Sequence, residues 1–266
     1  MLLAIDIGNT NVTIGLFEKN SLIYKNNIHT DINYDYKQDL SILYTSYSFC
    51  DCIISSVVDE ITNIIAEAVN AIIGKTPAVV SSGMNLDLVI KAENPAKIGC
   101  DRLVNAYAAK KLYSTPAIVI DAGTATTFDI INENGDFIGG LIMPGINTQL
   151  KSLSSNTSKL PELNLSDFTT NTKIINTETS KAILSGVVNG HTRAIEGLIT
   201  DCRQELKQTP ITILTGGNAN IISKCNKYTE FDYINIDLTL IGLNLIFNHI
   251  TNWMYVIYNS NYTVMG

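Results

Sequence analysis

The 266-residue chain has few basic residues, with 18 Lys and Arg against 25 Asp and Glu and a net charge of −7. An acidic chain without a basic stripe binds nucleic acid and anionic membranes poorly, so we expect neither as a partner. The chain also lacks a Walker-type loop ending in lysine. Any phosphate binding must therefore use backbone N–H groups, a few placed cations or metal ions.

Cysteine and histidine are scarce and show no metal-binding spacing. The five cysteines are scattered: Cys50, Cys52, Cys100, Cys202 and Cys225. The three histidines lie far apart: His29, His191 and His249. We expect free thiols in a reducing cytosol, and structural or surface roles for the histidines.

Features of a signal peptide or a membrane span are missing as well. Residues 1–5 are apolar without a basic region, and Asp6 follows at once, which predicts a buried strand. The apolar residues 241–258 are interrupted by Asn244, Asn248 and His249, which is typical of a core helix. The predicted location is the cytoplasm.

One pattern of strands occurs twice along the chain. Apolar residues 2–5 end in Asp6-x-Gly8, and strands are expected at 12–17 and 21–26. Apolar residues 117–120 end in Asp121-x-Gly123, followed by strands at 126–131 and 137–141. The two aspartates are 115 residues apart, and the same offset carries the turn at Lys19-Asn20 onto Asn134-Gly135. Two landmarks at one offset indicate a duplicated unit.

Helical segments accompany both sets of strands. Apolar spacing predicts helices at 36–44, 60–73, 101–112, 179–201 and from about 238, with further strands at 52–58, 77–80 and 211–214. Residues 151–179 are expected to be loop with a short helix. The arrangement predicts an α/β chain of two similar domains, residues 1–114 and 115–266.

The two Asp-x-Gly turns offer ligands for phosphate. Gly8 lets the backbone approach a ligand, and Asp6 can hold Mg²⁺ directly or through water. Asn9, Thr10 and Asn11 add donors, and residues 121–126 repeat this chemistry. A plain β-turn explains either segment alone, but two copies favour phosphate binding across a cleft between the domains.

Two further segments carry polar residues at element ends. Thr215-Gly216-Gly217-Asn218 follows a strand, and its glycines suit a backbone lying against a base or ribose, although a helix-initiating turn is the plainer interpretation. Asp101, in Gly99-Cys100-Asp101-Arg102, is either a helix cap or the acceptor of a substrate hydroxyl proton. Arg102 beside it could hold a carbonyl or anionic oxygen.

Six motifs, in this order, resemble those of the type III pantothenate kinase family of the acetate and sugar kinase/Hsp70/actin superfamily. They are Asp6-x-Gly8-Asn9-Thr10, Gly99-x-Asp101-Arg102, Asp121-Ala122-Gly123-Thr124-Ala125, Gly139-Gly140-x-Ile142-x-Pro144-Gly145, Thr179-x-x-Ala182-Ile183-x-Ser185-Gly186 and Leu214-Thr215-Gly216-Gly217. The resemblance covers residues 2 to about 248. It implies two ribonuclease-H-like domains in an actin-like ATPase fold, a homodimer, and transfer of the ATP γ-phosphate to the 4′-hydroxyl of pantothenate, the first step toward coenzyme A.

The resemblance also implies roles for individual residues. Asp101 is the expected proton acceptor. Pantothenate is expected to meet Gly99, Cys100, Asp101, Arg102 and, near the dimer interface, Thr179. ATP is expected to meet Asp6, Ile7, Gly8, Asn9, Thr10, Asn11, Val12, Thr13 and, at its phosphates, Thr124. Asp121 is the expected ligand of K⁺ or NH₄⁺, and Mg²⁺ is expected with the ATP.

The chain departs from the family pattern at two places, and two alternatives stay open. Glu93 stands where many members have Tyr before an Asn-Pro pair, so the pantothenate pocket wall is expected to differ. Residues 252–266, with Trp253, Tyr255 and Tyr258, are either an added helix end or a loosely attached extension. The alternatives are a regulatory protein on this scaffold and a kinase for another hydroxyl, such as a sugar's. Asp101 and Asp121 argue against the first, and the Gly99 segment with Thr179 against the second.

Overall fold

The computed structural model describes the backbone of residues 1–262 and the side chains of residues 1–251. The side chains of Trp253, Tyr255 and Tyr258, and residues 263–266, lie outside the described part. The chain divides into two compact units, the first formed by Met1–Leu112 with the segment from Asp237 onward, the second by Tyr113–Ile236.

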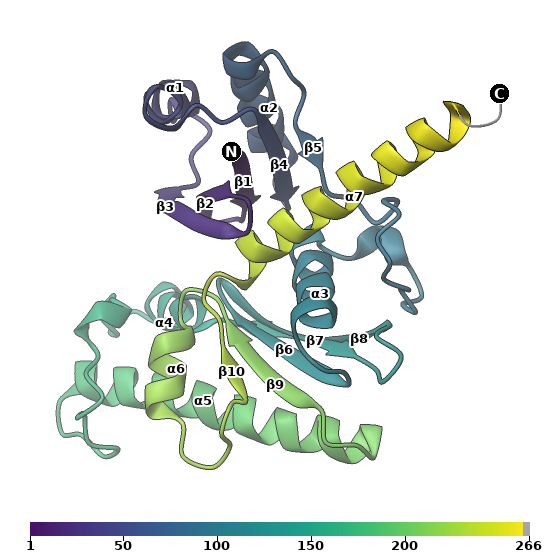
Figure 1. Ribbon diagram of the computed structural model, residues 1–266. Helices are drawn as coiled ribbons and strands as arrows, with labels where there is room; N and C mark the ends of the chain where they lie inside the picture. The colour runs from purple at the N-terminus through teal and green to yellow at the C-terminus, as the bar shows by residue number, and fades with distance from the viewer. Residues whose placement is uncertain (263–266) are drawn as a thin grey trace. The chain divides into compact units, whose positions relative to one another are not determined.

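The first unit is built on a five-stranded sheet in the order β3-β2-β1-β4-β5 (Figure 1). Its elements are β1 (Leu2–Ile7), β2 (Asn11–Glu18), β3 (Ser21–His29), α1 (Tyr36–Tyr47), β4 (Asp51–Ser56), α2 (Asp59–Ile73), β5 (Ala78–Val79), the 3₁₀ turn Pro95–Lys97, α3 (Cys100–Leu112) and α7 (Leu238–Tyr262). The central strand β1 is apolar except for Asp6 because both faces are covered: Leu3 and Ile5 join the core with α1 and α2, while Leu2 and Ala4 face α3 and α7.

The second unit repeats this topology in the sheet β10-β9-β6-β7-β8. Its elements are β6 (Ala117–Ala122), β7 (Ala125–Ile131), β8 (Phe137–Pro144), α4 (Ile146–Ser155), the 3₁₀ turn Leu165–Asp167, α5 (Thr179–Leu206), β9 (Ile211–Thr215), α6 (Ala219–Cys225) and β10 (Tyr233–Ile234). In each sheet the central strand, β1 or β6, pairs antiparallel with the strand that follows it in the chain, β2 or β7. It pairs parallel with the fourth strand of its unit, β4 or β9. The predicted duplication and α/β class are confirmed.

The last helix, α7, was predicted to lie in the second domain, residues 115–266, and the structure assigns it to the other unit. It belongs with the first unit, because Leu240, Leu243 and Ile246 are buried in the core that also holds Leu2 and Ala4. A Cβ added to Gly242 would lie 2.6 Å from Val104 Cγ1, so α7 crosses α3 closely. The C-terminal domain therefore does not run to residue 266. None of the helices in the described part of the chain has a stretch long and apolar enough to cross a bilayer.

Candidate functional site

The first Asp-x-Gly turn joins β1 to β2 and is held by backbone bonds and one threonine. Asp6 is half-buried and pairs in register with Thr13 on β2 and Ser55 on β4. The Gly8 N–H donates to the Asn11 carbonyl at 2.9 Å, and Thr30 Oγ1 donates to the Gly8 carbonyl at 2.8 Å. The tip of this turn is therefore fixed while the neighbouring Asn9 side chain stays exposed.

The start of α3 lies beside the same end of the sheet. The Val57 N–H, just past β4, donates to the Ile7 carbonyl at 3.0 Å. A Cβ added to Gly99 would lie 3.6 Å from Val57 Cγ1 and only 2.5 Å from Asp101 Oδ1. The glycine thus leaves the room into which the Asp101 carboxylate folds, and the structure brings the Gly99 segment next to the exits of β1 and β4.

Asp101 occupies the second position of α3, one residue inside the helix rather than at its cap. Burial raises the pKa of the Asp101 carboxyl, and the Arg102 N–H, which donates to Asp101 Oδ1 at 2.8 Å, and the Arg102 charge oppose that rise only in part. Burial, followed by the charge of Asp101 and more weakly by that of Asp6, also raises the pKa of the Cys100 thiol. A carboxyl with a raised pKa in a recessed position is suited to accept a proton.

The second Asp-x-Gly turn joins β6 to β7 and is more tightly enclosed. Two groups at the start of α4 donate to the Thr124 carbonyl: the Gly145 N–H at 2.9 Å and Thr148 Oγ1 at 2.6 Å. A Cβ added to Gly145 would lie 2.2 Å from the Gly123 carbonyl oxygen. Only glycine allows the helix to begin this close to the turn.

The Gly-Gly motif after β9 packs against Asp121. Gly216 has φ +90°, and a Cβ there would lie 2.3 Å from Asp121 Oδ1 and 2.7 Å from the Ala122 nitrogen. The Asn218 N–H donates to the Ala122 carbonyl at 2.9 Å. Gly216 therefore packs against the second turn, whereas a Cβ added to Gly217 would meet nothing within 4 Å.

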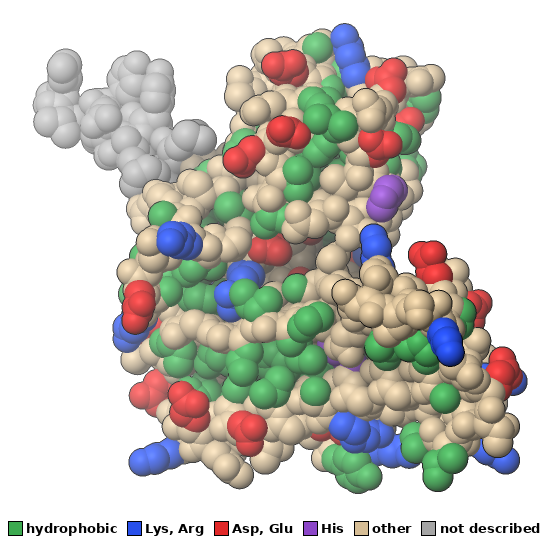
Figure 2. Space-filling view, turned by 180° about the vertical axis from the view of Figure 1, so that it is seen from behind, with side chains coloured by type: hydrophobic (Ala, Val, Ile, Leu, Met, Phe, Trp, Pro, Cys, Tyr) green, Lys and Arg blue, Asp and Glu red, His purple; other side chains and the backbone are tan. Residues whose placement is uncertain are grey.

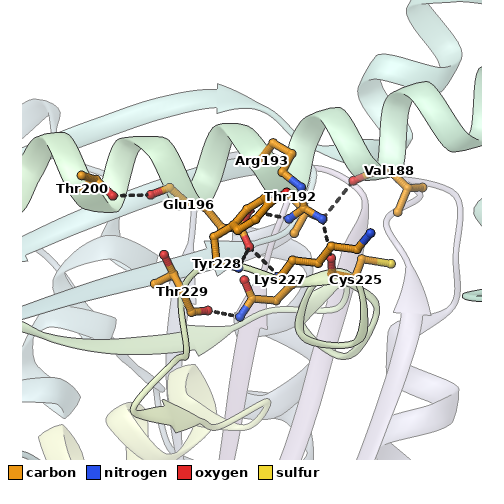
Figure 3. Close-up of polar contacts among 10 residues, drawn as sticks. Val188, Thr192, Arg193, Glu196, Thr200, Cys225, Lys227, Tyr228 and Thr229 are labelled. Atoms are coloured by element: carbon orange, nitrogen blue, oxygen red, sulfur yellow. Dashed lines mark hydrogen bonds and ion pairs between the residues drawn. The ribbon is translucent and has the colours of Figure 1, made fainter. Parts of the chain in front are cut away.

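A buried carboxylate fastens the segment that follows α6 onto α5 (Figure 3). Glu196 Oε1 accepts the backbone N–H groups of Lys227 at 2.7 Å and Tyr228 at 2.8 Å, and Oε2 pairs with Arg193, which donates to the Cys225 carbonyl at 3.0 Å. Burial acts to raise the pKa of Glu196, but these donors together lower it. Helix α6 is thus held at the end opposite the Gly-Gly motif.

Thr179 is exposed at the first residue of α5, in the second unit. The loop before it is held by the buried Ser185, whose hydroxyl lies 3.1 Å from the Lys173 carbonyl and 3.0 Å from that of Ile174. Glu93, at the predicted pocket wall, is exposed in the first unit. Thr179 thus belongs to the second unit and Glu93 to the first.

The two strand-end aspartates can be tested as cation ligands by their surroundings. Within residues 1–251, three or more His, Cys, Asp or Glu side chains nowhere gather as a metal cluster would require. Mg²⁺ on a nucleotide keeps several waters and needs one or two carboxylates besides the phosphates, which fits the half-buried Asp6. Asp121, also half-buried, is the only acidic residue of the segment 121–126, and its Oδ1 packs against the Gly216 backbone.

Comparison with known proteins decides the family. The profile of "Type III pantothenate kinase" matches residues 2–201. This chain belongs to the type III pantothenate kinase family. It is 36% identical over 258 residues to the type III pantothenate kinase of Persephonella marina, with 94% of this chain and 99% of that one covered.

Two solved structures share the kinase's fold. One, described as a Baf family transcriptional activator from Campylobacter jejuni, has a TM-score of 0.60 at 19% identity, covering 94% of this chain and 99% of that chain. The other is the activator of 2-hydroxyisocaproyl-CoA dehydratase from Clostridium difficile with bound ADPNP, with a TM-score of 0.52 at 12% identity over 96% and 97%. At these identities they show the fold alone, which is the expected actin-like ATPase fold.

The family match establishes the activity class. The kinase uses metal-bound ATP to phosphorylate pantothenate at its 4′-hydroxyl, the first step of coenzyme A biosynthesis. The regulatory protein and the sugar kinase, left open by the sequence, are set aside by the extent of this match.

Sequence reasoning missed several residues that shape the kinase's turns. Nothing in the sequence marks Gly145 beyond its place in a motif, and the close approach predicted at Gly216 was to a nucleotide and not to Asp121, although neither position leaves room for a side chain. Thr30 and Thr148 carry no pattern that would mark them, because their partners are 22 and 24 residues away. A spacing between the strand-end turn and the next glycine that stays constant among related sequences is the one signal that could have identified Gly145 and Gly216.

Proposed function

We propose that Asp101 accepts the proton of the pantothenate 4′-hydroxyl while that oxygen forms a bond to the γ-phosphorus and the bond to the β–γ bridging oxygen breaks. The single observation that carries the proposal is the half-buried Asp101 carboxylate, which lies in the space that Gly99 leaves at the start of α3 and whose pKa is raised by burial. Gly99, Cys100 and Arg102 form the pantothenate segment around it, with Arg102 the cation for the substrate's carbonyl or anionic oxygens.

The test is Asp101→Asn, which keeps the shape of the side chain but cannot take up a proton. We expect kcat to fall by roughly 10²- to 10⁴-fold, with the KM for ATP and the Tm unchanged. ADP release is measured with pantothenate, with a sugar panel and without acceptor. Asp59→Asn, which removes another carboxylate of the same end of the sheet, is the matched control and keeps full activity. An active Asp101→Asn enzyme removes Asp101 as the base.

Both Asp-x-Gly turns contribute to ATP binding in this proposal. The first turn binds the phosphates through Asp6, Ile7, Gly8, Asn9, Thr10, Asn11, Val12 and Thr13, with Mg²⁺ at Asp6. The second binds them through Thr124, with K⁺ or NH₄⁺ at Asp121. In support, Asn9 and Thr124 are both exposed at the tips of their turns, and each turn begins with a half-buried aspartate, Asp6 or Asp121. Bound cations offset the triphosphate charge, for which an acidic chain has few side chains to spare.

The kinase works as a homodimer, with Thr179 binding pantothenate near the interface. In support, the outer face of α5 carries Gly186, Gly190 and Gly197, where an added Cβ would meet nothing within 4 Å. A hollow of about 430 Å³ beside α5 has apolar walls that include Ile138 and Leu198, and Figure 2 shows hydrophobic side chains gathered over the second unit. Gly190→Glu is expected to give monomers in analytical ultracentrifugation and a higher KM for pantothenate; an active Gly190→Glu monomer contradicts it.

The proposed location is the cytoplasm, and nucleic acid and membranes are not proposed as partners. The structure describes the side chains of all five cysteines. All five are free thiols, as a reducing compartment allows. On the face drawn in Figure 2, basic and acidic side chains are interspersed, which is unlike the basic stripe of a nucleic-acid-binding surface.

A further inference from the structure

His191 has no role in the reaction described so far, yet it is buried beside the second turn. It lies in the middle of α5 with an exposed fraction of 2%. Its Nε2 is 3.0 Å from Thr126 Oγ1, and its Nδ1 is 2.8 Å from Gln149 Nε2. Thr126 lies on β7 two residues after Thr124, and Gln149 lies in the first turn of α4. One imidazole thus joins the strand that leaves the turn to the helix that begins next to it.

The hydrogen bonds assign the proton on the ring. Gln149 Nε2 also donates to the Pro144 carbonyl at 2.9 Å, and an amide NH₂ can only donate. His191 Nδ1 must therefore accept, and Nε2 carries the proton that it donates to Thr126 Oγ1. Burial lowers the pKa of His191 to about 4, which agrees with a neutral ring. The three side chains have one consistent arrangement at neutral pH.

Together with the bonds at the start of α4, these hydrogen bonds form a closed series of contacts that includes Thr124. The Gly145 N–H and Thr148 Oγ1 fix the Thr124 carbonyl to the start of α4. Helix α4 is in turn fixed through Gln149 and His191 to Thr126, and β7 leads from there back to Thr124. The imidazole at the centre is buried, and both of its ring nitrogens are hydrogen-bonded, which favours one geometry and resists small displacements.

We propose that His191 is a positioning residue for ATP binding, which holds Thr124 in place for the ATP phosphates through Thr126 on one side and Gln149 on the other. The inference rests on the proposed phosphate contact of Thr124. His191 itself touches neither substrate in this account.

The test compares two substitutions of His191 by the KM for each substrate. His191→Phe keeps a flat ring and removes both hydrogen bonds, and it is expected to raise the KM for ATP roughly tenfold while the KM for pantothenate stays unchanged. His191→Gln keeps a donor toward Thr126 and is expected to recover most of the ATP affinity. Ile199→Ala, two turns further along α5 in the same core, is the control: its Tm falls without a rise in the KM for ATP.

Three results would overturn the inference: an unchanged KM for ATP in His191→Phe, an equal rise in both KM values, or the same rise in Ile199→Ala. Thr124→Ala separates the inference from its premise. If Thr124→Ala leaves the KM for ATP unchanged, the phosphate contact fails and the inference fails with it. If Thr124→Ala raises that KM and His191→Phe does not, only the positioning role of His191 is lost.

Discussion

The two Asp-x-Gly turns have the same sequence pattern and the same place in duplicate sheets, but they are held in different ways. Each turn has one backbone bond across its tip, from Gly8 to Asn11 and from Gly123 to Ala125, and the first is further held by Thr30, which bonds to the carbonyls of Gly8 and Thr10. The second is enclosed by Gly145 and Gly216 and braced by the network of His191. Duplication therefore preserved the strands and the aspartate while the surroundings diverged. The tips themselves are alike, since Asn9 and Thr124 are both exposed, so the difference lies in what supports each turn.

The largest effect that distinguishes the turns is expected from glycine substitutions. Gly216→Ala places a methyl group at φ +90° against Asp121 Oδ1 and the Ala122 nitrogen, and should destabilise the protein by roughly 2–4 kcal/mol. A Cβ at Gly8 would meet only the Asn11 carbonyl oxygen, at 3.3 Å, so Gly8→Ala should cost less than about 1 kcal/mol.

Thermal unfolding of both variants, together with the KM for ATP, checks this comparison. Gly8→Ala is expected to fold normally and bind ATP more weakly, because its methyl group occupies the exposed side where the phosphates approach. Equal losses of Tm in the two variants would show that the turns are enclosed to the same degree.

A smaller effect on the stability of the folded protein is expected from a change of pH, and it acts through His191 beside the second turn. The pKa of His191 is about 4 in the folded protein, below its ordinary value of 6.5, because of burial. The unfolded chain therefore binds more protons between pH 6.5 and 4, and the folded state loses stability as the pH falls through that window. The loss is at most about 1.4 kcal/mol per pH unit.

The measurement is the difference in Tm between the wild-type enzyme and His191→Gln at pH 7 and at pH 5. The stability advantage of the wild type over His191→Gln should shrink at pH 5, and contributions from His29 and His249 cancel in the difference. An advantage that is the same at both pH values would mean that His191 is not held neutral by the fold.

Much of the fold could be predicted because the signals are local. Apolar runs ending in Asp-x-Gly marked β1 and β6, and Gly99-x-Asp101-Arg102 marked the start of α3. The raised pKa of Asp101 comes from burial, which the sequence does not reveal. The unit to which α7 belongs could not be predicted, because an apolar helix does not reveal which core covers it. The network of His191 joins residues 65 and 42 positions apart, and no spacing in the sequence connects them.

The most direct test of the unequal turns is the dependence of the reaction rate on K⁺ and on Mg²⁺–ATP in Asp6→Asn and Asp121→Asn. We expect Asp121→Asn to need far more K⁺ or to lose activity, with its response to Mg²⁺–ATP less affected. Asp6→Asn should need more Mg²⁺–ATP and keep the K⁺ response of the wild type. An unchanged K⁺ response in Asp121→Asn, or a shifted one in Asp6→Asn, would contradict the assignment of the monovalent cation to the second turn.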